Sequence, residues 1–479
     1  MSSDDVFAGS RFLGKDFMKK SKFSGSSFVV ASVEAGNTTT KCIMTATDMK
    51  TGITEIVGRC VRLTRDVRAP AEGEKIFGET IGGTPLTTES LAEFVKDTIR
   101  QALFENNLTV DDIHFVVRST GVTVETGEGL EMIILSLANG CLLAGFTPRK
   151  MTGYLSLEQM PEKLRPYSYL DKVYFDGAVA GVLPPAGLVG SVISNEMEGE
   201  LALAGLKEAG KHQGLDFRNP CIAIDMGTTL SGRIADDSKP YAKTVGNFCG
   251  YAGAIVDALV QKTDFGAKSA FEYFNMHPEI QPVFPSKNVT IGVLKEAMEI
   301  IRIMEIPPGR KQFGPFAVNA EVAKKAGLTL FGCDIGENGS GLSELSDIGA
   351  RLYEKGATDS EKIGNIMAAA DEIMSEVAAS LISEVREAGL LSENVRVGIT
   401  GRAGITGNKP SLTLEKLNKM KIMPAPEENV LFAEDGLARG AAVMARCMNS
   451  LGCPNNPISG NRGGKCIMRE RQTLQNSRN

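Results

Sequence analysis

The chain has 479 residues, of which 42% are hydrophobic and 23% are charged, and its formal net charge is -6. This length exceeds that of one ordinary hydrophobic core, so it favours two or more domains, and the composition is typical of a soluble globular protein. The acidic balance offers no general attraction for a phosphate backbone, which excludes nucleic acid as an expected partner.

Membrane segments and metal-binding patterns are also not expected. No apolar run reaches the roughly 18 residues of a spanning helix, and the amino terminus lacks an apolar signal core, so we expect a cytoplasmic protein without membrane contact. The nine cysteines are scattered without a C-x-x-C pair, and the three histidines are not spaced for a metal. This argues against a disulfide framework, a zinc finger and a Ser-His-Asp triad.

The first structured region is an antiparallel meander. Residues 1–25 lack periodicity and predict a mobile amino-terminal arm. Three strands are predicted next, at 28–33, 41–47 and 53–63, with a turn signal between the last two. The apolar spacing then predicts a helix over 88–106 and a buried strand over 113–118.

The same pattern occurs a second time, with strands predicted at 221–225, 230–234 and 241–245. Each meander opens with an apolar strand that ends in an acid, Glu34 or Asp225, followed by glycine and threonines. The two acids are about one domain length apart, which indicates two related halves that face each other. The remaining predictions are a helix over 361–388, a strand over 395–400, a closing helix over 432–449 and an irregular tail over 451–479.

The second hairpin has the composition of a phosphate-binding loop. Small residues let backbone N–H groups approach an anion and hydroxyls add donors, which makes Gly227, Thr228 and Thr229 candidate nucleotide-binding residues. Asp225 is a candidate magnesium ligand, through water, because magnesium keeps several of its waters. The chain returns directly into a strand, unlike a P-loop. The alternative is a tight turn at Gly227 with ordinary strand threonines.

The first hairpin repeats these features, and a third glycine-rich turn follows. Glu34 is the corresponding metal candidate, and Lys41 can reach a phosphate oxygen as a point charge. The candidate phosphate-binding residues of this loop are Gly36, Asn37, Thr38, Thr39 and Thr40. The third turn, at a strand end, allows a flat nucleoside to lie against backbone at Gly401, Arg402, Ala403 and Gly404. Alone, it would be an ordinary glycine turn.

Taken in this order, the three loops resemble those of the superfamily that joins actin, the heat-shock chaperone ATPases, the acetate and sugar kinases and ATP-driven enzyme activators. The resemblance implies an α/β fold of two ribonuclease-H-like, actin-like ATPase domains, with mixed sheets flanked by helices and ATP and Mg²⁺ in the cleft between them. It places domain I at 26–205, domain II at 206–428 and a closing helix that returns to domain I at 429–450.

The resemblance also implies catalytic roles. Residues 195–202 resemble the connecting helix, so Glu196 is a candidate for positioning the attacking water, together with Asp225; the alternative for Glu196 is a capped amphipathic helix. The superfamily usually has aspartate where this chain has Glu34, which carries one more methylene group. The metal and water geometry is therefore expected to differ, and hydrolysis to be slow.

More closely, the chain resembles the methanogenesis marker protein 14 family of methanogenic archaea, through segments 30–42, 175–181, 246–250 and 333–339. The first loop also resembles the ATPases that activate 2-hydroxyacyl-CoA dehydratases, in which cysteines of two subunits hold an iron–sulfur cluster. By that match Cys249 would bind the cluster in a homodimer; the alternative is a buried small hydrophobic residue.

These resemblances imply a nucleotide-driven activator or repair chaperone whose protein client is an enzyme of methanogenesis. The alternatives are a scaffold that binds nucleotide without catalysis, for which Glu34 is the main argument, and a small-metabolite kinase. The absence of tryptophan and the low aromatic content speak against an aromatic sugar platform.

Overall fold

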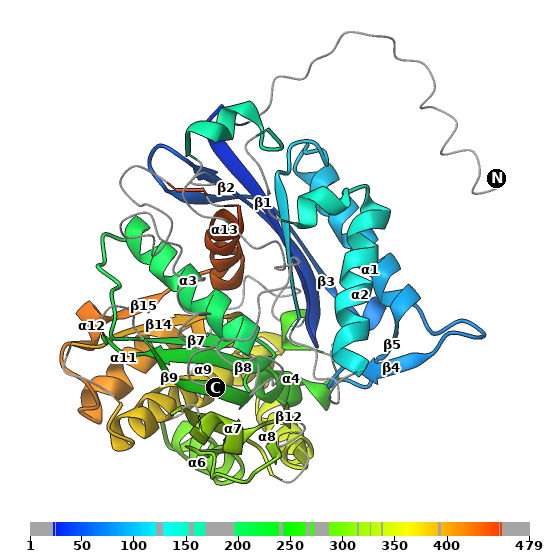
Figure 1. Ribbon diagram of the computed structural model, residues 1–479. Coiled ribbons are helices and arrows are strands. Elements are labelled where there is room, and N and C mark those ends of the chain that lie inside the picture. Colours follow the sequence, from blue (N-terminus) through cyan, green and yellow to red (C-terminus); the bar gives the residue numbers. More distant parts are fainter. Residues whose placement is uncertain are drawn as a thin grey trace.

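The computed structural model describes residues 23, 25–120, 128–152, 158–167, 196–238, 243–264, 269–272, 287–313, 316–325, 327–336, 339–390, 394–449 and 451–452. Most of the predicted arm and tail, and segment 175–181, therefore lie outside the described residues. Two main sheets, each covered by helices, organise the described part of the chain (Figure 1). The mixed α/β class predicted from the sequence is confirmed.

The first sheet has the order β3-β2-β1-β6. Strands β1, β2 and β3 form an antiparallel meander, and β6 lies parallel to β1 on its other side. The register places Glu34 opposite Lys41 across the first hairpin. The strands are β1 (Ser27–Ala35), β2 (Thr39–Asp48), β3 (Thr54–Leu63) and β6 (Phe115–Thr120).

The second sheet contains the same arrangement at its centre, β9-β8-β7-β14, and is extended on both sides. Strands β7, β8 and β9 form the second meander, and β14 lies parallel to β7. The predicted repetition of the meander is thus confirmed. The strands are β7 (Cys221–Met226), β8 (Thr229–Ala235), β9 (Thr244–Tyr251), β10 (Arg302–Glu305), β13 (Thr329–Asp334), β14 (Arg396–Thr400) and β15 (Val430–Phe432).

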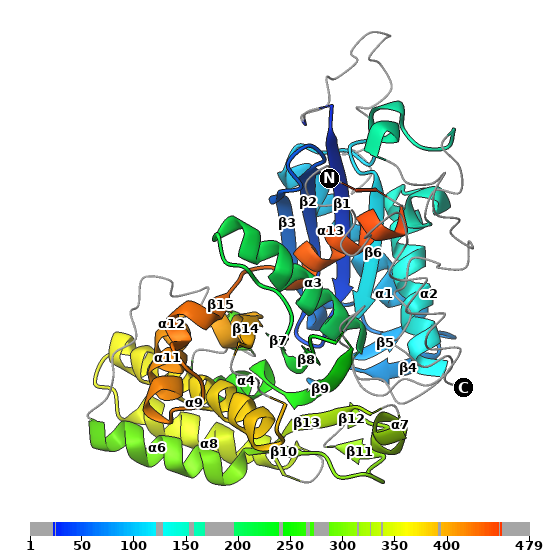
Figure 2. The same ribbon diagram turned by 60° about the vertical axis from the view of Figure 1, so that its left-hand side comes forward.

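Helices cover both faces of each main sheet. The outer face of the first sheet packs on α1 (Thr88–Glu105) and α2 (Glu128–Ala144), whereas α3 (Glu196–His212) and α13 (Gly436–Met448) lie between the two sheets (Figure 2). The far face of the second sheet packs on a larger set. These helices are α4 (Gly253–Gln261), α6 (Lys287–Ile300), α8 (Gly341–Glu354), α9 (Asp359–Glu387) and α11 (Lys409–Lys419).

The remaining elements are short. Two small hairpins, β4–β5 and β11–β12, lie outside the main sheets. Their bounds, with those of the short helices, are β4 (Ile76–Glu79), β5 (Pro85–Thr87), β11 (Gln312–Phe313), β12 (Phe316–Ala317), α7 (Ala320–Lys325), α10 (Arg402–Ile405) and α12 (Pro426–Asn429). No helix among the described residues combines the length and hydrophobicity needed to cross a membrane.

Two elements differ from the sequence prediction. Strand β9 runs to Tyr251, beyond the predicted 241–245, because Gly246 and Gly250 are used for close strand packing: a Cβ at Gly250 would overlap the backbone of Cys333. The closing helix begins at Gly436 rather than at Phe432. Phe432 belongs to β15, which pairs with β14, and Asp435 has a left-handed φ of 54° that interrupts the helical backbone.

The two central helices cross without intervening side chains. A Cβ on Gly205 of α3 would overlap the carbonyl oxygen of Gly436, and one on Gly440 of α13 would overlap that of Leu201. Around this crossing, apolar residues of both sheets form one continuous core. The glycines therefore let the two helices approach to backbone contact and join the two halves.

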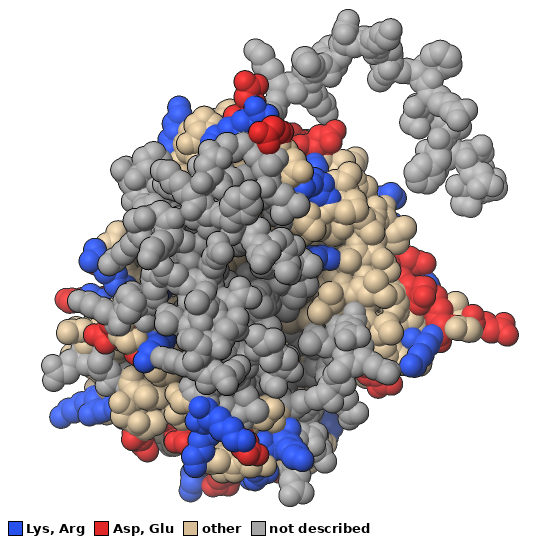
Figure 3. All heavy atoms as spheres, viewed as in Figure 1, with Lys and Arg blue, Asp and Glu red and all other residues tan. Residues whose placement is uncertain are grey.

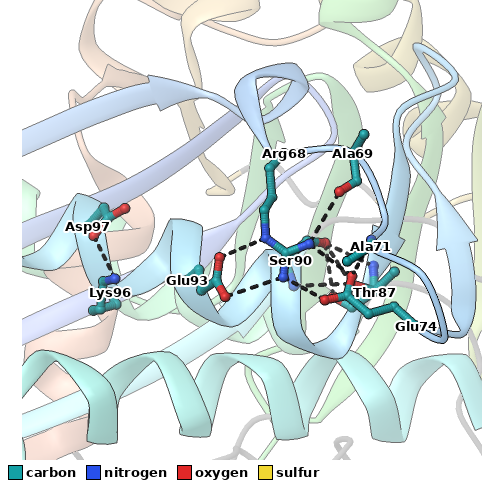
Figure 4. Close-up of polar contacts among 9 residues, drawn as sticks. All are labelled: Arg68, Ala69, Ala71, Glu74, Thr87, Ser90, Glu93, Lys96 and Asp97. Atoms are coloured by element: carbon teal, nitrogen blue, oxygen red, sulfur yellow. Dashed lines mark hydrogen bonds and ion pairs between the residues drawn. The ribbon is translucent and has the colours of Figure 1, made fainter.

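A polar network fixes the long connection between β3 and α1. Arg68 donates to Glu74 at 2.6 and 2.9 Å and to Glu93 at 2.7 and 3.2 Å (Figure 4). The Arg68 guanidinium holds the pKa of Glu74 at about 2. Thr87 and Ser90 form a capping box at the start of α1. This network anchors the β4–β5 hairpin, from which the Ile81 amide donates to Asn37 in the first loop.

His114 makes the stability of the first sheet sensitive to acid. Its Nδ1 accepts from the Val29 amide at 3.0 Å, and burial, with the charges of Lys163 and Lys150, lowers its pKa to about 3. Between pH 6.5 and 3 the unfolded chain takes up a proton that the folded protein does not, so acidification favours unfolding.

We expect this histidine to cost about 2 kcal/mol of stability between pH 7 and pH 5. In the His114→Asn variant the amide oxygen replaces Nδ1 as acceptor, and that part of the pH dependence should disappear. Urea unfolding of both proteins at the two pH values measures it. Equal losses in the two proteins would contradict the assignment.

Candidate active site

A pocket of about 600 Å³ opens between the two sheets, within the size range of small-molecule sites. Both hairpin loops, the β14–α10 turn, α4 and the start of α13 line it. It brings together most of the site residues predicted from the sequence. These are Glu34, Gly36, Asn37, Thr38, Thr39, Lys41, Asp225, Gly227, Thr228, Thr229, Gly401, Arg402 and Ala403.

The two hairpin loops touch each other across this pocket. The Thr228 hydroxyl donates to the Thr38 hydroxyl at 2.8 Å, and Thr38 in turn donates to Oδ2 of Asp257 at 3.0 Å. The carbonyl of Gly227 accepts from the Gly253 amide at 2.7 Å, which ties the second loop to the start of α4. The loops of the two meanders thus form opposite walls of one site.

Two carboxylates, Glu34 and Asp225, and Lys41 form a charged cluster in the pocket. Lys41 Nζ lies 3.2 Å from Oε1 of Glu34. Burial and the negative charge of Glu34 raise the pKa of Asp225 to about 7, against the opposing effect of Lys41. Burial alone would lower the pKa of Lys41, but Glu34 and Asp225 outweigh it and the net pKa is raised. The two carboxylates therefore repel each other, and the lysine only partly balances them.

Such a pair fits a divalent cation. Magnesium binds through one or two carboxylates and keeps several waters, which is the donor set that Glu34 and Asp225 supply. Asp225 is 4% exposed and Glu34 is 8% exposed, so both are shielded from bulk water. Among the described residues, no cluster of three or more His, Cys, Asp or Glu side chains has metal-binding geometry. In that part of the chain, a metal ion would therefore be bound by at most two such side chains and by water.

The third loop lies against the second. Gly401 has a φ of 84°, and a Cβ there would overlap the backbone of Met226. The Arg402 guanidinium lies 4.1 Å from the centroid of the Phe271 ring, so a flat cationic group and an aromatic ring are stacked at the edge of the pocket. The glycine is required for the close approach that puts Arg402 there.

Four predicted residues lie elsewhere or cannot be placed. Thr40 is fully buried and its hydroxyl shares a hydrogen bond with Thr64. Gly404 packs on Ile399 and Met226 rather than lining the pocket. Cys249 is buried beside Phe313 and Leu330 in a separate apolar cluster. The side chain of Glu196, the first residue of α3, lies outside the described part of the structure.

The structure adds site residues that the sequence did not indicate. Glu198 of α3 lines the pocket and is 3% exposed. Arg59 donates to Asp435 at 2.6 Å, and Lys409 donates to Asp371 at 2.6 Å in a buried ion pair; all four line the pocket. Glu198 lies within the predicted connecting helix, but residues two apart on a helix point to opposite sides, so the prediction of Glu196 carried no signal for it. The two ion pairs join distant segments, and no local pattern indicated them.

The chain matches, over residues 27–475, the model of the family described as "Uncharacterized protein conserved in archaea (DUF2114)". The chain belongs to this archaeal family. It is 49% identical over 456 residues to a protein of Methanocaldococcus jannaschii, covering 94% of this chain and 92% of that protein. It is 45% identical over 488 residues to a protein of Methanothermobacter thermautotrophicus, covering 98% and 89%. The narrower assignment to methanogenesis marker protein 14 stays a prediction.

Several solved structures are similar at low identity. A reductive activator for a corrinoid, iron-sulfur protein matches with 12% identity and a TM-score of 0.33, over 95% of this chain and 63% of that one. A hexokinase matches with 10% identity and a TM-score of 0.35, over 87% and 83%. The ROK hexokinase of Thermus thermophilus matches with 12% identity and a TM-score of 0.29, over 87% and 98%.

Proposed function

We propose that this protein binds ATP with Mg²⁺ in the pocket between its two sheets and hydrolyses it. The observation that carries the proposal is the pair of glycine–threonine hairpin loops that face each other at 2.8 Å between Thr228 and Thr38. Glycines and threonines of both loops line the pocket from two sides, which suits a chain of phosphates. Lys41 supplies the positive charge, and Glu34 and Asp225 would hold the magnesium ion, which neutralises phosphate charge when bound.

The proposal includes the actin-like ATPase fold, with domain I at 26–205, domain II at 206–428 and a closing segment at 429–450. The repeated strand order supports it, since β3-β2-β1-β6 and β9-β8-β7-β14 match in order and direction. The helices α3 and α13 between the sheets would then be the connections through which one half moves against the other. Arg402 and Phe271 would border the nucleoside, and the loop at Gly401 would form the backbone wall against which the nucleoside lies.

For hydrolysis, we assign Glu198 to the attacking water. It lines the same pocket as Asp225, and its carboxylate is buried, where a general base is shielded from competing water. The water oxygen would bond to the γ-phosphorus while the bond from that phosphorus to the β–γ bridging oxygen breaks. Glu198 would accept the water proton, and the departing ADP oxygen would keep the electron pair.

The Glu198→Gln variant tests this assignment. The amide keeps the shape of the side chain but accepts no proton, so we expect single-turnover hydrolysis to slow by about 100-fold while ATP affinity changes little. Glu200, two residues along α3, is unsuitable as an activity control, because it is ion-paired with Arg233 and its replacement would affect folding. Exposed Glu354→Gln therefore serves as the activity control.

The two possible failures of this experiment are distinguishable. If the wild type binds ATP but does not hydrolyse it in a single turnover, the protein is a nucleotide-binding scaffold without catalysis. If Glu198→Gln hydrolyses ATP at the wild-type rate, the base is another residue, and Glu196 is the next to test. Turnover that requires a small metabolite would instead identify a kinase.

We further propose that opening and closing of the cleft acts on a partner enzyme of methanogenesis. Two contacts connect the halves directly: Thr38 with Thr228 inside the pocket, and Arg65 with Glu272 outside it. A ligand that binds both walls adds to these contacts and favours closure, and its hydrolysis removes them. The archaeal methanogen relatives support the choice of pathway. An iron–sulfur cluster at Cys249 stays a prediction.

A further inference from the structure

Helix α2 presents an apolar face to the solvent as well as to the core. Ile133, Leu137 and Cys141 are buried against the first sheet, yet Leu135, Leu142 and Leu143 on the other side are 47%, 42% and 50% exposed. At the end of the neighbouring helix α1, Phe104 is 82% exposed. Single exposed apolar residues are ordinary, but four on adjacent helices form a patch that is typical of an interaction site.

This face, which we call the α1–α2 face, consists of Phe104, Leu135, Asn139, Leu142 and Leu143. The helices run side by side, since a Cβ on Gly140 would touch Val95, and the Arg100 guanidinium donates to the carbonyl of Leu143 at 2.9 Å. Figure 3 shows largely uncharged surface over α2 on the right-hand side of the molecule, whereas the exposed residues of α1 are mostly charged. No Lys, Arg, Asp or Glu occurs from Met132 to Ala144.

We propose that the α1–α2 face binds the same face of a second copy of this chain, forming a two-fold symmetric dimer. In an isologous contact the same patch of both subunits is in contact. A charged residue near the two-fold axis would therefore lie close to the same charged residue of the second copy. The seam on α2 has none. Leu135, Asn139 and Leu142 follow one another at intervals of four and three residues, which is the spacing of a helix–helix seam.

Asn139 gives the seam a self-complementary polar group. Its side chain makes no hydrogen bond within the described part of the chain, and an amide carries both a donor and an acceptor. Two copies of Asn139 across a two-fold axis can therefore satisfy each other, as a buried asparagine does when it fixes the register of paired helices. An unrelated partner would need a matching amide at this point, whereas a second copy brings it automatically.

The size of the face agrees with a dimer. Helices of 18 and 17 residues, lying side by side, cover roughly 25 by 20 Å, a flat area of about 500 Å², which is of the same order as the roughly 800 Å² of accessible surface that each partner of a stable complex buries. Charged residues of both signs lie on α1 beside it, namely Lys96, Asp97 and Glu105, and Arg100 reaches into the face at the carbonyl of Leu143. An apolar centre with a mixed polar rim is the usual anatomy of a protein interface.

The oligomeric state in solution tests the proposal. We expect sedimentation equilibrium to show a dimer at about 50 µM, and the Leu135→Lys/Leu142→Lys variant to be monomeric, with dimer affinity lowered by about 100-fold or more. Both leucines are half exposed, so the lysines can reach solvent and the fold should tolerate them. Ile291→Lys on α6, which is 57% exposed far from this face, is the matched control and should remain dimeric.

A cross-link then locates the two-fold axis. In a background with Cys453→Ser and Cys466→Ser, the Asn139→Cys variant should form a disulfide-linked dimer under mild oxidation, because the axis brings the two copies of this position together. Ile291→Cys should not. A monomeric wild type would overturn the proposal, and the face would then bind a different partner. A dimer that persists in the double lysine variant and gives no cross-link at position 139 would also overturn it.

Discussion

The Asp225→Asn variant is expected to lose ATP affinity by about 100-fold in the presence of magnesium, which is about 2.7 kcal/mol. The reason is electrostatic. Asp225 is one of the two carboxylates that would hold the metal, and the amide keeps its shape without its charge. Without magnesium, wild type and variant should bind ATP with similar, weak affinity. Calorimetric titration with and without magnesium measures all four values.

The same variant should fold at least as well as the wild type. Burial and Glu34 raise the pKa of Asp225 to about 7. Above that pH the folded protein carries a buried negative charge that has a lower free energy in the solvated unfolded chain. Removing it should leave the urea midpoint at pH 8 unchanged or higher. Asp237→Asn, on an exposed residue of the loop after β8, is the control for a carboxylate-to-amide change. If both variants bind magnesium and ATP like the wild type, the metal is not held at Asp225.

The Gly205→Ala variant is expected to lose about 3 kcal/mol or more of stability. Its Cβ would overlap the carbonyl oxygen of Gly436, which is backbone and cannot rotate away. The helices α3 and α13 would have to separate, and the core they share with both sheets would open. Thermal unfolding followed by circular dichroism should show a midpoint lower by about 3 °C or more.

Gly292→Ala provides a control with the opposite sign. Gly292 also lies inside a helix, α6, but no atom stands within 4 Å of a Cβ added there. Alanine is a better helix former than glycine, so this variant should gain about 0.5 to 1 kcal/mol. If Gly205→Ala unfolded at the same temperature as Gly292→Ala, the tight crossing of the two central helices would be wrong.

The sequence predicted those parts of the site that depend on local chemistry. Each hairpin loop needs an apolar strand, an acid, a glycine and threonines within a few residues, so Glu34 and Asp225 were found without knowledge of the fold. The strands that carry them were also predictable, because a continuous apolar run bounded by turn residues is a local signal for a fully buried strand. The repetition of the pattern led to the expectation of two facing halves.

The rest depended on contacts between distant segments. Arg59 meets Asp435 across 376 residues, and Lys409 meets Asp371 across 38, so neither pair has a spacing that marks it in the sequence. Strand β9 was predicted too short because glycines usually indicate turns, whereas here Gly250 makes room for the backbone of a neighbouring strand. The closing helix was predicted to start too early because the apolar residues of β15 continue its pattern.

Binding of ATP by the wild-type chain is the most direct test of this account. Calorimetric titration with ATP and magnesium should show one site per chain, with a dissociation constant of about 10 µM or tighter, and much weaker binding once magnesium is removed. A labelled nucleotide displaced by unlabelled ATP should give the same affinity. If neither measurement detects binding at about 1 mM ATP, the pocket between the two sheets is not a nucleotide site.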